Sequence, residues 1–383
     1  MIIMGICLNM IVRNESKTLP RLFSTLKGIV DYYVISDTGS TDNTIDIIKA
    51  LGEQYGIMGT VSSHPWVDFA FNRNIVLAEA IQAKNDSLHD CNWLMFIDAD
   101  EELVISDKQW KDQLEAGKSY YVYKKINGLA FKHLFLAWIN DQQWLWKGEI
   151  HNYLINKTKN HTKVFTRMFY IIYHEFEGAK SHAFRDSKEK NLEDIKMLEI
   201  ELDGTMVNAD NLHRFFQLGY LYKNIEDIPS AIQKMEQVAY FKHTPDSTKY
   251  SALVLIIKFL IKGKAPTQRV LPYLEDAIRI DGLRKEAYYY RAILYRKEGA
   301  LEEALTMLEK ALSIDFVDLG YVFFEEDIYI WKIKYELVFV YYQTNQASKS
   351  LAVLNELLEG DKIPEIERQF LISLMSRITP IVD

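Results

Sequence analysis

Two aspartates at the end of an apolar segment carry the most informative chemistry in this sequence. Residues 93–97 read Trp-Leu-Met-Phe-Ile and lead directly to Asp98 and Asp100, with two glutamates after them. Such a run is typical of a buried strand, and alternate residues at a strand end point the same way, so both carboxylates can face one site. One or two carboxylates, together with phosphate oxygens, commonly hold Mg²⁺ or Mn²⁺. The segment therefore predicts a metal–diphosphate site, with a solvated acidic turn as the alternative.

A second apolar segment, Tyr-Tyr-Val-Ile-Ser, ends in Asp37. Gly39 permits the tight turn that follows, and Ser40 or Thr41 can cap the next helix. Asp42 lies near the N-terminus of that helix. Simple helix capping is the alternative interpretation of this segment.

A third polar group follows in the sequence Asp-Phe-Ala-Phe-Asn-Arg-Asn, which contains Asp68, Arg73 and Asn74 at the expected entry of a helix. An arginine in this position can neutralise phosphate or form an ion pair with a carboxylate. A purely structural arginine–aspartate pair explains the segment equally well.

The elements that must position these groups alternate between strands and helices. Apolar periodicity predicts strands at 5–12, 32–36, 58–64 and 93–97, separated by helices at 16–27, after 41 and at 69–83. This order predicts an α/β fold with a mostly parallel sheet, and ligands of such sheets bind beyond the carboxyl ends of the strands. From about 119 to 173 the pattern becomes strand-rich and aromatic.

The second half of the chain has helical periodicity and internal repeats. Ala277 precedes Ala311 by 34 residues, the length of one tetratricopeptide repeat. Looser copies surround Gly219 and Tyr341, and a generic helical bundle is the alternative. We expect a catalytic domain at 1–185, a linking helix at 186–210 and an all-α repeat domain at 211–383.

Composition limits the classes of function. The 383 residues carry a net charge of −8, which disfavours nucleic acid as a partner. The two cysteines, Cys7 and Cys91, lie in apolar strand-like segments, so we expect a reducing, cytoplasmic location, either free or at a membrane surface. No apolar run reaches the roughly 18 residues of a membrane span, and the apolar start lacks a basic segment, so it is interpreted as a strand.

Four blocks together resemble glycosyltransferase family 2: LNMIVRNESKTLPRLFSTL, VISDTGSTDNT, DFAFNRN and WLMFIDADEEL. They are most similar to the branch that has a DTGSTD element and an appended tetratricopeptide domain, and the resemblance covers roughly residues 5–185. It implies a GT-A fold, a nucleotide-diphosphate sugar donor with UDP as the carrier, a divalent metal, and inversion at the anomeric carbon.

The resemblance also implies roles for individual residues. Asp37 would contact the nucleoside, although Thr38 stands where many relatives carry a second aspartate. Asp98 would lie near ribose and metal. The other nucleotide contacts would come from Arg13, Asn14, Glu15, Asp42, Arg73 and Asn74, and the other metal ligands would be Asp100 and His174.

The block WLWKGEIHNYL resembles the branch's Trp-x-Gly-x-Val-His-Glu element, with Asn152 in place of the glutamate. An inverting transfer needs a base for the acceptor hydroxyl, and asparagine cannot serve. Glu149 and Asp141 are therefore the candidate catalytic bases.

Three tryptophans in the same aromatic region have two interpretations. Trp138, Trp144 and Trp146 could form a platform on which a sugar stacks, or they could be core residues.

The sequence thus predicts a metal-dependent hexosyl- or N-acetylhexosaminyltransferase that acts on a glycan, glycolipid or protein acceptor. The repeats would hold the acceptor, a partner protein or a second subunit. One alternative is a weak or inactive transferase domain that serves as a repeat scaffold. Another is a nucleotidyltransferase, which would release pyrophosphate from a nucleoside triphosphate.

Overall fold

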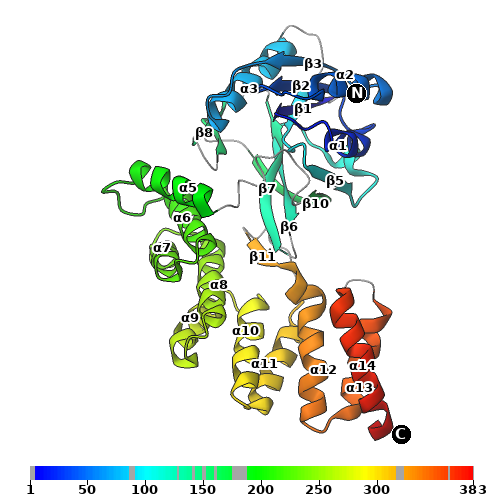
Figure 1. Ribbon diagram of the computed structural model, residues 1–383, viewed down its shortest axis with the longest axis vertical. Coiled ribbons are helices and arrows are strands. Elements are labelled where there is room, and N and C mark those ends of the chain that lie inside the picture. Colours follow the sequence, from blue (N-terminus) through cyan, green and yellow to red (C-terminus); the bar gives the residue numbers. More distant parts are fainter. Residues whose placement is uncertain are drawn as a thin grey trace. The chain divides into compact units, whose positions relative to one another are not determined.

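The chain forms two compact units in the computed structural model, residues 1–190 and 191–383 (Figure 1). The division lies between Lys190 and Asn191, inside helix α5. The residues that the structure describes are 5–85, 91–126, 129–139, 143–148, 152–158, 162–174, 188–315, 323–360 and 363–382.

The first unit is built on a mixed sheet. Its parallel part has the order β3-β2-β1-β4, formed by Met58–Ser63, Tyr32–Asp37, Gly5–Val12 and Cys91–Met95. The sheet continues in the order β7-β6-β10-β5, formed by Leu129–Trp138, Lys118–Ile126, Thr162–Tyr173 and Glu101–Ile105. Strand β7 is antiparallel to β4 and β6, whereas β10 is parallel to β6 and antiparallel to β5. The predicted α/β class is confirmed, and the predicted parallel order holds for the first four strands.

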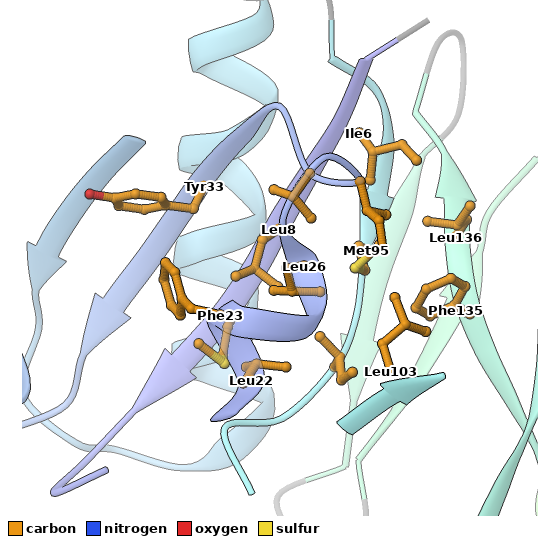
Figure 2. Close-up of a cluster of buried hydrophobic side chains, with 14 of the residues drawn as sticks. Ile6, Leu8, Leu22, Phe23, Leu26, Tyr33, Met95, Leu103, Phe135 and Leu136 are labelled. Atoms are coloured by element: carbon orange, nitrogen blue, oxygen red, sulfur yellow. The ribbon is translucent and has the colours of Figure 1, made fainter. Parts of the chain in front are cut away.

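Two helices cover one face of the sheet, α1 (Leu19–Leu26) and α2 (Thr44–Tyr55). Leu22, Phe23 and Leu26 are fully buried because the helical period puts them on one side of α1. They pack with Leu8 of β1 and Tyr33 of β2 in the core shown in Figure 2. Each such side chain stabilises the fold by roughly 1.5–3 kcal/mol on burial.

Helix α3 (Phe69–Asn85) covers the opposite face. Its Val76 and Leu77 pack against the residues of β1 and β2 that alternate with the first core, such as Cys7 and Val34. The described part of this unit also contains the antiparallel pair of β8 (Trp144–Lys147) and β9 (Tyr153–Asn156), and the short helix η1 (Trp110–Gln113).

The second unit is a series of helices in which consecutive members pack as hairpins (Figure 1). The pairs are α6/α7, α8/α9, α10/α11 and α12/α13, preceded by α5 and followed by α14. Their bounds are α5 Lys188–Glu201, α6 Leu212–Asn224, α7 Ile228–Tyr240, α8 Asp246–Lys262, α9 Thr267–Ile280, α10 Glu286–Lys297, α11 Leu301–Ser313, α12 Ile333–Gln343, α13 Ala347–Glu359 and α14 Glu365–Val382. The short segments β11 (Phe323–Glu325) and η2 (Ile328–Lys332) precede α12.

Small residues set the close approach within the hairpins, as the repeat pattern predicts. A Cβ atom on Gly219 of α6 would lie 2.9 Å from Met235 Cε and 3.2 Å from the Ala231 carbonyl oxygen of α7. Ala277 and Ala311 are both fully buried near the ends of α9 and α11. The unit is therefore an all-α array of tetratricopeptide-like hairpins. In the described part of the chain, no helix is both long and apolar enough to span a membrane.

Candidate active site

The carboxyl ends of the parallel strands bring the predicted motifs to one edge of the sheet. The register places Val12 of β1 beside Asp37 of β2, and Asp37 beside Ser63 of β3. Strand β4 is parallel to β1 on the other side, so the turn that follows β4 leaves the sheet at the same edge. This is the edge at which open α/β sheets bind their ligands.

Asp37 is buried at this edge with one carboxylate oxygen in use and one without a partner. The backbone N–H groups of Gly39 and Ser40 both donate to Oδ2, each at 3.0 Å. Oδ1 is buried and has no hydrogen-bond partner among the described residues. Gly39 has a φ of 102°, a conformation that a side chain would strain, so glycine is required for this turn. The turn therefore holds the Asp37 carboxylate in a fixed position.

Asn14 connects the loops that follow β1 and β2. Its Oδ1 accepts the backbone N–H of Thr41 at 2.7 Å, and its own N–H donates to Ser40 Oγ at 2.9 Å. The predicted capping of α2 by Ser40 or Thr41 is wrong, because both residues are engaged by Asn14. The helix begins at Thr44, with Asn43 as its N-cap.

Glu15 and Asp42 strengthen the same connection. The N–H of Glu15 donates to Thr44 Oγ1 at 2.9 Å, and Asp42 accepts from the Thr44 N–H at 3.1 Å and from the Ser16 N–H at 3.4 Å. Desolvation raises the pKa of Asp42, but the hydrogen bonds from Thr44 and Ser16 outweigh desolvation, so the pKa is lowered. Arg13 is exposed on this loop. Asn14, Glu15 and Asp42 thus shape the loops, and Arg13 offers its side chain to solvent.

The acidic turn after β4 differs from the predicted strand end. The strand ends at Met95, and the turn is closed by reciprocal bonds: Asp98 N–H to Glu101 Oε2 at 2.9 Å, and Glu101 N–H to the Asp98 carbonyl at 3.0 Å. Asp100 is 3 % exposed, whereas the side chain of Asp98 is 38 % exposed. Because Asp98 and Asp100 lie in a turn, the rule that alternate residues of a strand point the same way does not determine the directions of their carboxylates.

Helix α3 brings Arg73 to the acidic turn. Its Nη2 forms an ion pair with Asp98 Oδ1 at 2.6 Å, and its guanidinium lies 4.8 Å from the ring centroid of Trp146. Both polar atoms of the Asn74 side chain bind the Trp146 backbone, Nδ2 to the carbonyl at 2.9 Å and Oδ1 to the N–H at 2.8 Å. Asn74 therefore fixes β8 beside α3, and Arg73 is the side chain of this pair that reaches the acidic turn.

Two residues near the acidic turn were missed by sequence reasoning. Lys124 of β6 forms an ion pair with Glu101 Oε1. His133 of β7 is half-buried, and one of its ring nitrogens lies 3.2 Å from the Phe96 carbonyl oxygen. In the sequence, Lys124 and His133 are recognisable only as polar residues within aromatic strand segments, and this does not indicate which residues they contact.

His174 lies next to the turn but is engaged elsewhere. Its backbone N–H donates to the Asp100 carbonyl at 3.2 Å, and its Nε2 lies 2.8 Å from Glu102 Oε2. Within the described ranges, no three histidine, cysteine, aspartate or glutamate side chains are grouped as a ready-made metal site. The metal-binding role of His174 stays a prediction, and with Nε2 beside Glu102 it would use the other ring nitrogen, Nδ1.

The two candidate bases, Asp141 and Glu149, lie outside the described residues. Asn152, where the resemblance leads one to expect glutamate, is described and half-buried. The assignment of the base therefore rests on the sequence.

The tryptophans of this region belong to the core. Trp144 and Trp146 are 7 % and 8 % exposed, and the Trp144 indole N–H donates to the Trp138 carbonyl at 2.8 Å. The ring centroid of Trp138 lies 4.9 Å from that of Trp93. Of the two interpretations, the structure supports packing residues over a sugar platform.

The fold and the edge together define a class of domain. The sheet has a parallel part, β3-β2-β1-β4, that a mixed part continues, and acidic residues lie at the end of β2 and in the turn after β4. This is the arrangement of a GT-A domain. Residues 7–116 match the model of "Glycosyl transferase family 2". The first unit of this chain therefore carries a domain of that family.

Part of the chain is similar in sequence to curated proteins. An "Uncharacterized glycosyltransferase" of Rickettsia felis is 30 % identical over 137 residues, which are 35 % of this chain and 40 % of the relative. Another from Rickettsia bellii is 33 % identical over 105 residues, 27 % of this chain and 30 % of the relative. A "TPR repeat-containing protein" of Synechococcus elongatus is 35 % identical over 101 residues, 26 % of this chain and 21 % of the relative. The chain thus spans less than half the length of each of these relatives.

Solved structures with some similarity include a tetratricopeptide repeat protein from Parabacteroides merdae, with 17 % identity and a TM-score of 0.38, covering 53 % of this chain and 75 % of the other. MamA has 16 % identity and a TM-score of 0.36, covering 46 % of this chain and 91 % of the other.

Proposed function

We propose that this protein transfers a glycosyl group from a nucleotide-diphosphate sugar, with UDP as the carrier, to a hydroxyl group of a glycan, glycolipid or protein. The observation that carries the proposal is the buried Asp37 Oδ1, which has no partner among the described residues and lies at the sheet edge of a family 2 domain. An acceptor in this position suits the imide N–H of uracil, because a buried acceptor without a partner is costly unless a ligand supplies a donor.

The residues of the acidic turn fit a divalent metal. Asp98 and Asp100 supply carboxylate oxygens, the donors that Mg²⁺ and Mn²⁺ prefer, and phosphate oxygens of the sugar donor would complete the coordination. When bound, the metal would act as a Lewis acid that offsets charge on the departing diphosphate. Asp98 would hold it while remaining near Arg73, and the buried Asp100 would be the more rigid ligand.

Positively charged side chains of the protein would also offset the negative charge of the diphosphate. Arg73 is fixed by the ion pair to Asp98 and by its position over Trp146, so its guanidinium is preorganised beside the diphosphate site. Arg13, exposed on the loop after β1, is the candidate for a second contact with the nucleotide. Asn14, Glu15, Asp42 and Asn74 hold the loops in which these contacts lie.

An inverting reaction would also need a base to accept the proton of the acceptor hydroxyl. Glu149 is the first candidate and Asp141 the second. The hairpin array would hold the acceptor, a partner protein or a second subunit. Asn152, in place of the glutamate of the resembled element, favours a second candidate function, in which a weak or inactive transferase domain accompanies an interaction array.

A binding experiment tests the proposal. The full chain should be stabilised against thermal unfolding by UDP, and more strongly when Mn²⁺ is present, because ligand binding to the folded state raises its melting temperature. ADP and GDP are the matched controls. Equal stabilisation by all three nucleotides, or by none, would contradict a UDP-linked donor.

A further inference from the structure

A lysine ammonium group is fixed beside the acidic turn and is not explained by the contacts proposed above. Lys124 lies on β6, separated from β5 by β10 in the sheet. Its Nζ forms an ion pair with Glu101 Oε1 and lies 5.5 Å from the ring centroid of Tyr173. The side chains of Lys124 and Glu101 are only 21 % and 1 % exposed, so this positive charge is held in place.

The fixed charge acts on both aspartates of the turn. The second oxygen of Glu101 accepts the Asp98 N–H at 2.9 Å, so one glutamate holds both Lys124 and the backbone of Asp98. Burial lowers the pKa of Lys124, but the carboxylates of Glu101, Asp98 and Asp100 outweigh burial and raise it. Lys124 is therefore charged at neutral pH.

The charges of Lys124, Glu101 and Asp98 also act on His133, which lies on the neighbouring strand β7. Burial, assisted by the charge of Lys124, lowers the pKa of His133 despite the opposing carboxylates of Glu101 and Asp98. At neutral pH His133 is therefore uncharged and adds no positive charge beside that of Lys124. The other cations at the turn are Arg73, which pairs with Asp98, and Arg21, whose Nη2 donates to the Asp100 carbonyl at 3.4 Å.

We propose that Lys124 is a built-in counter-charge of the acidic turn, which weakens the binding of a free divalent cation and strengthens the binding of the donor's diphosphate. The signs follow from Coulomb's law, since a fixed positive charge repels a cation and attracts an anion at the same place. The inference rests on the proposed function for its ligands. Lys124 is a charged contributor to the site that no sequence motif indicated.

The test uses charge substitutions in the full chain. Lys124→Gln removes the charge but retains a donor for Glu101, and Lys124→Arg retains the charge. Glu101→Gln removes one carboxylate, and the double variant Lys124→Gln/Glu101→Gln restores the local net charge. Circular dichroism and thermal melting confirm that each variant is folded at the temperature of measurement.

Two affinities are measured by titration calorimetry: Mn²⁺ without nucleotide, and UDP without metal. Lys124→Gln should bind Mn²⁺ about tenfold more tightly and UDP about tenfold more weakly, a change of about 1.4 kcal/mol in each case. Lys124→Arg and the double variant should resemble the wild type, and Glu101→Gln should bind Mn²⁺ more weakly.

Opposite changes in the two affinities are the signature of charge, because a distorted turn would weaken both. Unchanged affinities in Lys124→Gln, or a loss of both, would overturn the inference. If none of the proteins binds Mn²⁺ without nucleotide, the inference is overturned, whereas the metal of the proposed function, which the donor's phosphates would help to hold, is tested separately by UDP binding in the presence of Mn²⁺. If the affinities change in opposite directions but no UDP-sugar is turned over, the counter-charge stands and the transferase proposal fails.

Discussion

Asp37→Asn isolates the proposed nucleoside contact, because it changes one carboxylate oxygen into an N–H donor and leaves the other acceptor in place. The amide oxygen of asparagine can still accept the N–H groups of Gly39 and Ser40, which now lie 3.0 Å from Oδ2. The new NH₂ group takes the position of the buried Oδ1. In a complex with uracil, two donors would then face each other.

The expected magnitude follows from the loss of one hydrogen bond to a charged acceptor. Such a bond contributes about 1.5–3 kcal/mol, so the Kd of UDP should rise about 10- to 100-fold. Cytosine has an acceptor nitrogen where uracil has its imide N–H, so CDP should be affected less. The ratio of CDP to UDP affinity should therefore rise by about tenfold or more, on the same scale of energy per tenfold change.

The assay is titration calorimetry of UDP and CDP with the full chain, together with thermal melting. Asp42→Asn is the matched control, because Asp42 is bound by Thr44 and Ser16 and shapes the neighbouring loop. It should change the melting temperature more than the Kd of UDP. If Asp37→Asn lowers the melting temperature but leaves the UDP and CDP affinities within twofold of the wild type, Asp37 is only a turn residue and the reasoning is refuted.

Other predictions concern the metal, the base and the pH dependence of stability. Asp100→Asn should reduce turnover by about 100-fold or more, because a metal ion supplies several kcal/mol of transition-state stabilisation; normal turnover would exclude Asp100 as a ligand. Glu149→Gln should lower kcat by about 100-fold or more with donor affinity unchanged, whereas an effect confined to Asp141→Asn would move the base there. Burial, assisted by the charge of Arg214, lowers the pKa of His213 to about 4. Because the unfolded chain binds this proton first, the stability that neutral His213 contributes is complete above about pH 6.5 and is lost as the pH falls towards 4. Urea unfolding at pH 7.5 and pH 5 should therefore show a smaller loss of stability in His213→Gln than in the wild type, by about 2 kcal/mol, and equal losses would refute this linkage.

Local sequence patterns were sufficient for the architecture. Short apolar runs predicted the first strands, such as β1, which is buried on both faces, with Leu8 and Cys7 in opposite cores. The 34-residue spacing of Ala277 and Ala311 predicted tetratricopeptide-like repeats, and both alanines are fully buried. Gly39 was predicted to permit a tight turn, and its φ of 102° confirms that need. In each case the information lies within a few residues or in a fixed period.

The details of the site depend on contacts between distant segments. Lys124 reaches Glu101 across β10, and nothing near either residue in the sequence indicates this register. Asn74 was predicted to help hold the nucleotide, whereas the structure places both its polar atoms on Trp146, 72 residues away. Tertiary pairing of this kind is not encoded by periodicity, so a sequence motif identifies the neighbourhood of a site better than the role of each side chain.

We propose that this chain transfers a sugar from a nucleotide-diphosphate donor. The most direct measurement is to incubate the purified full chain and Mn²⁺ with radiolabelled UDP-sugars and candidate acceptors, and to identify both the released nucleotide and the labelled product. We predict release of UDP and transfer of label to a hydroxyl acceptor, both lost in Asp100→Asn. Absence of UDP release across the UDP-hexoses and UDP-N-acetylhexosamines, or release of pyrophosphate from a nucleoside triphosphate, would contradict the proposed function.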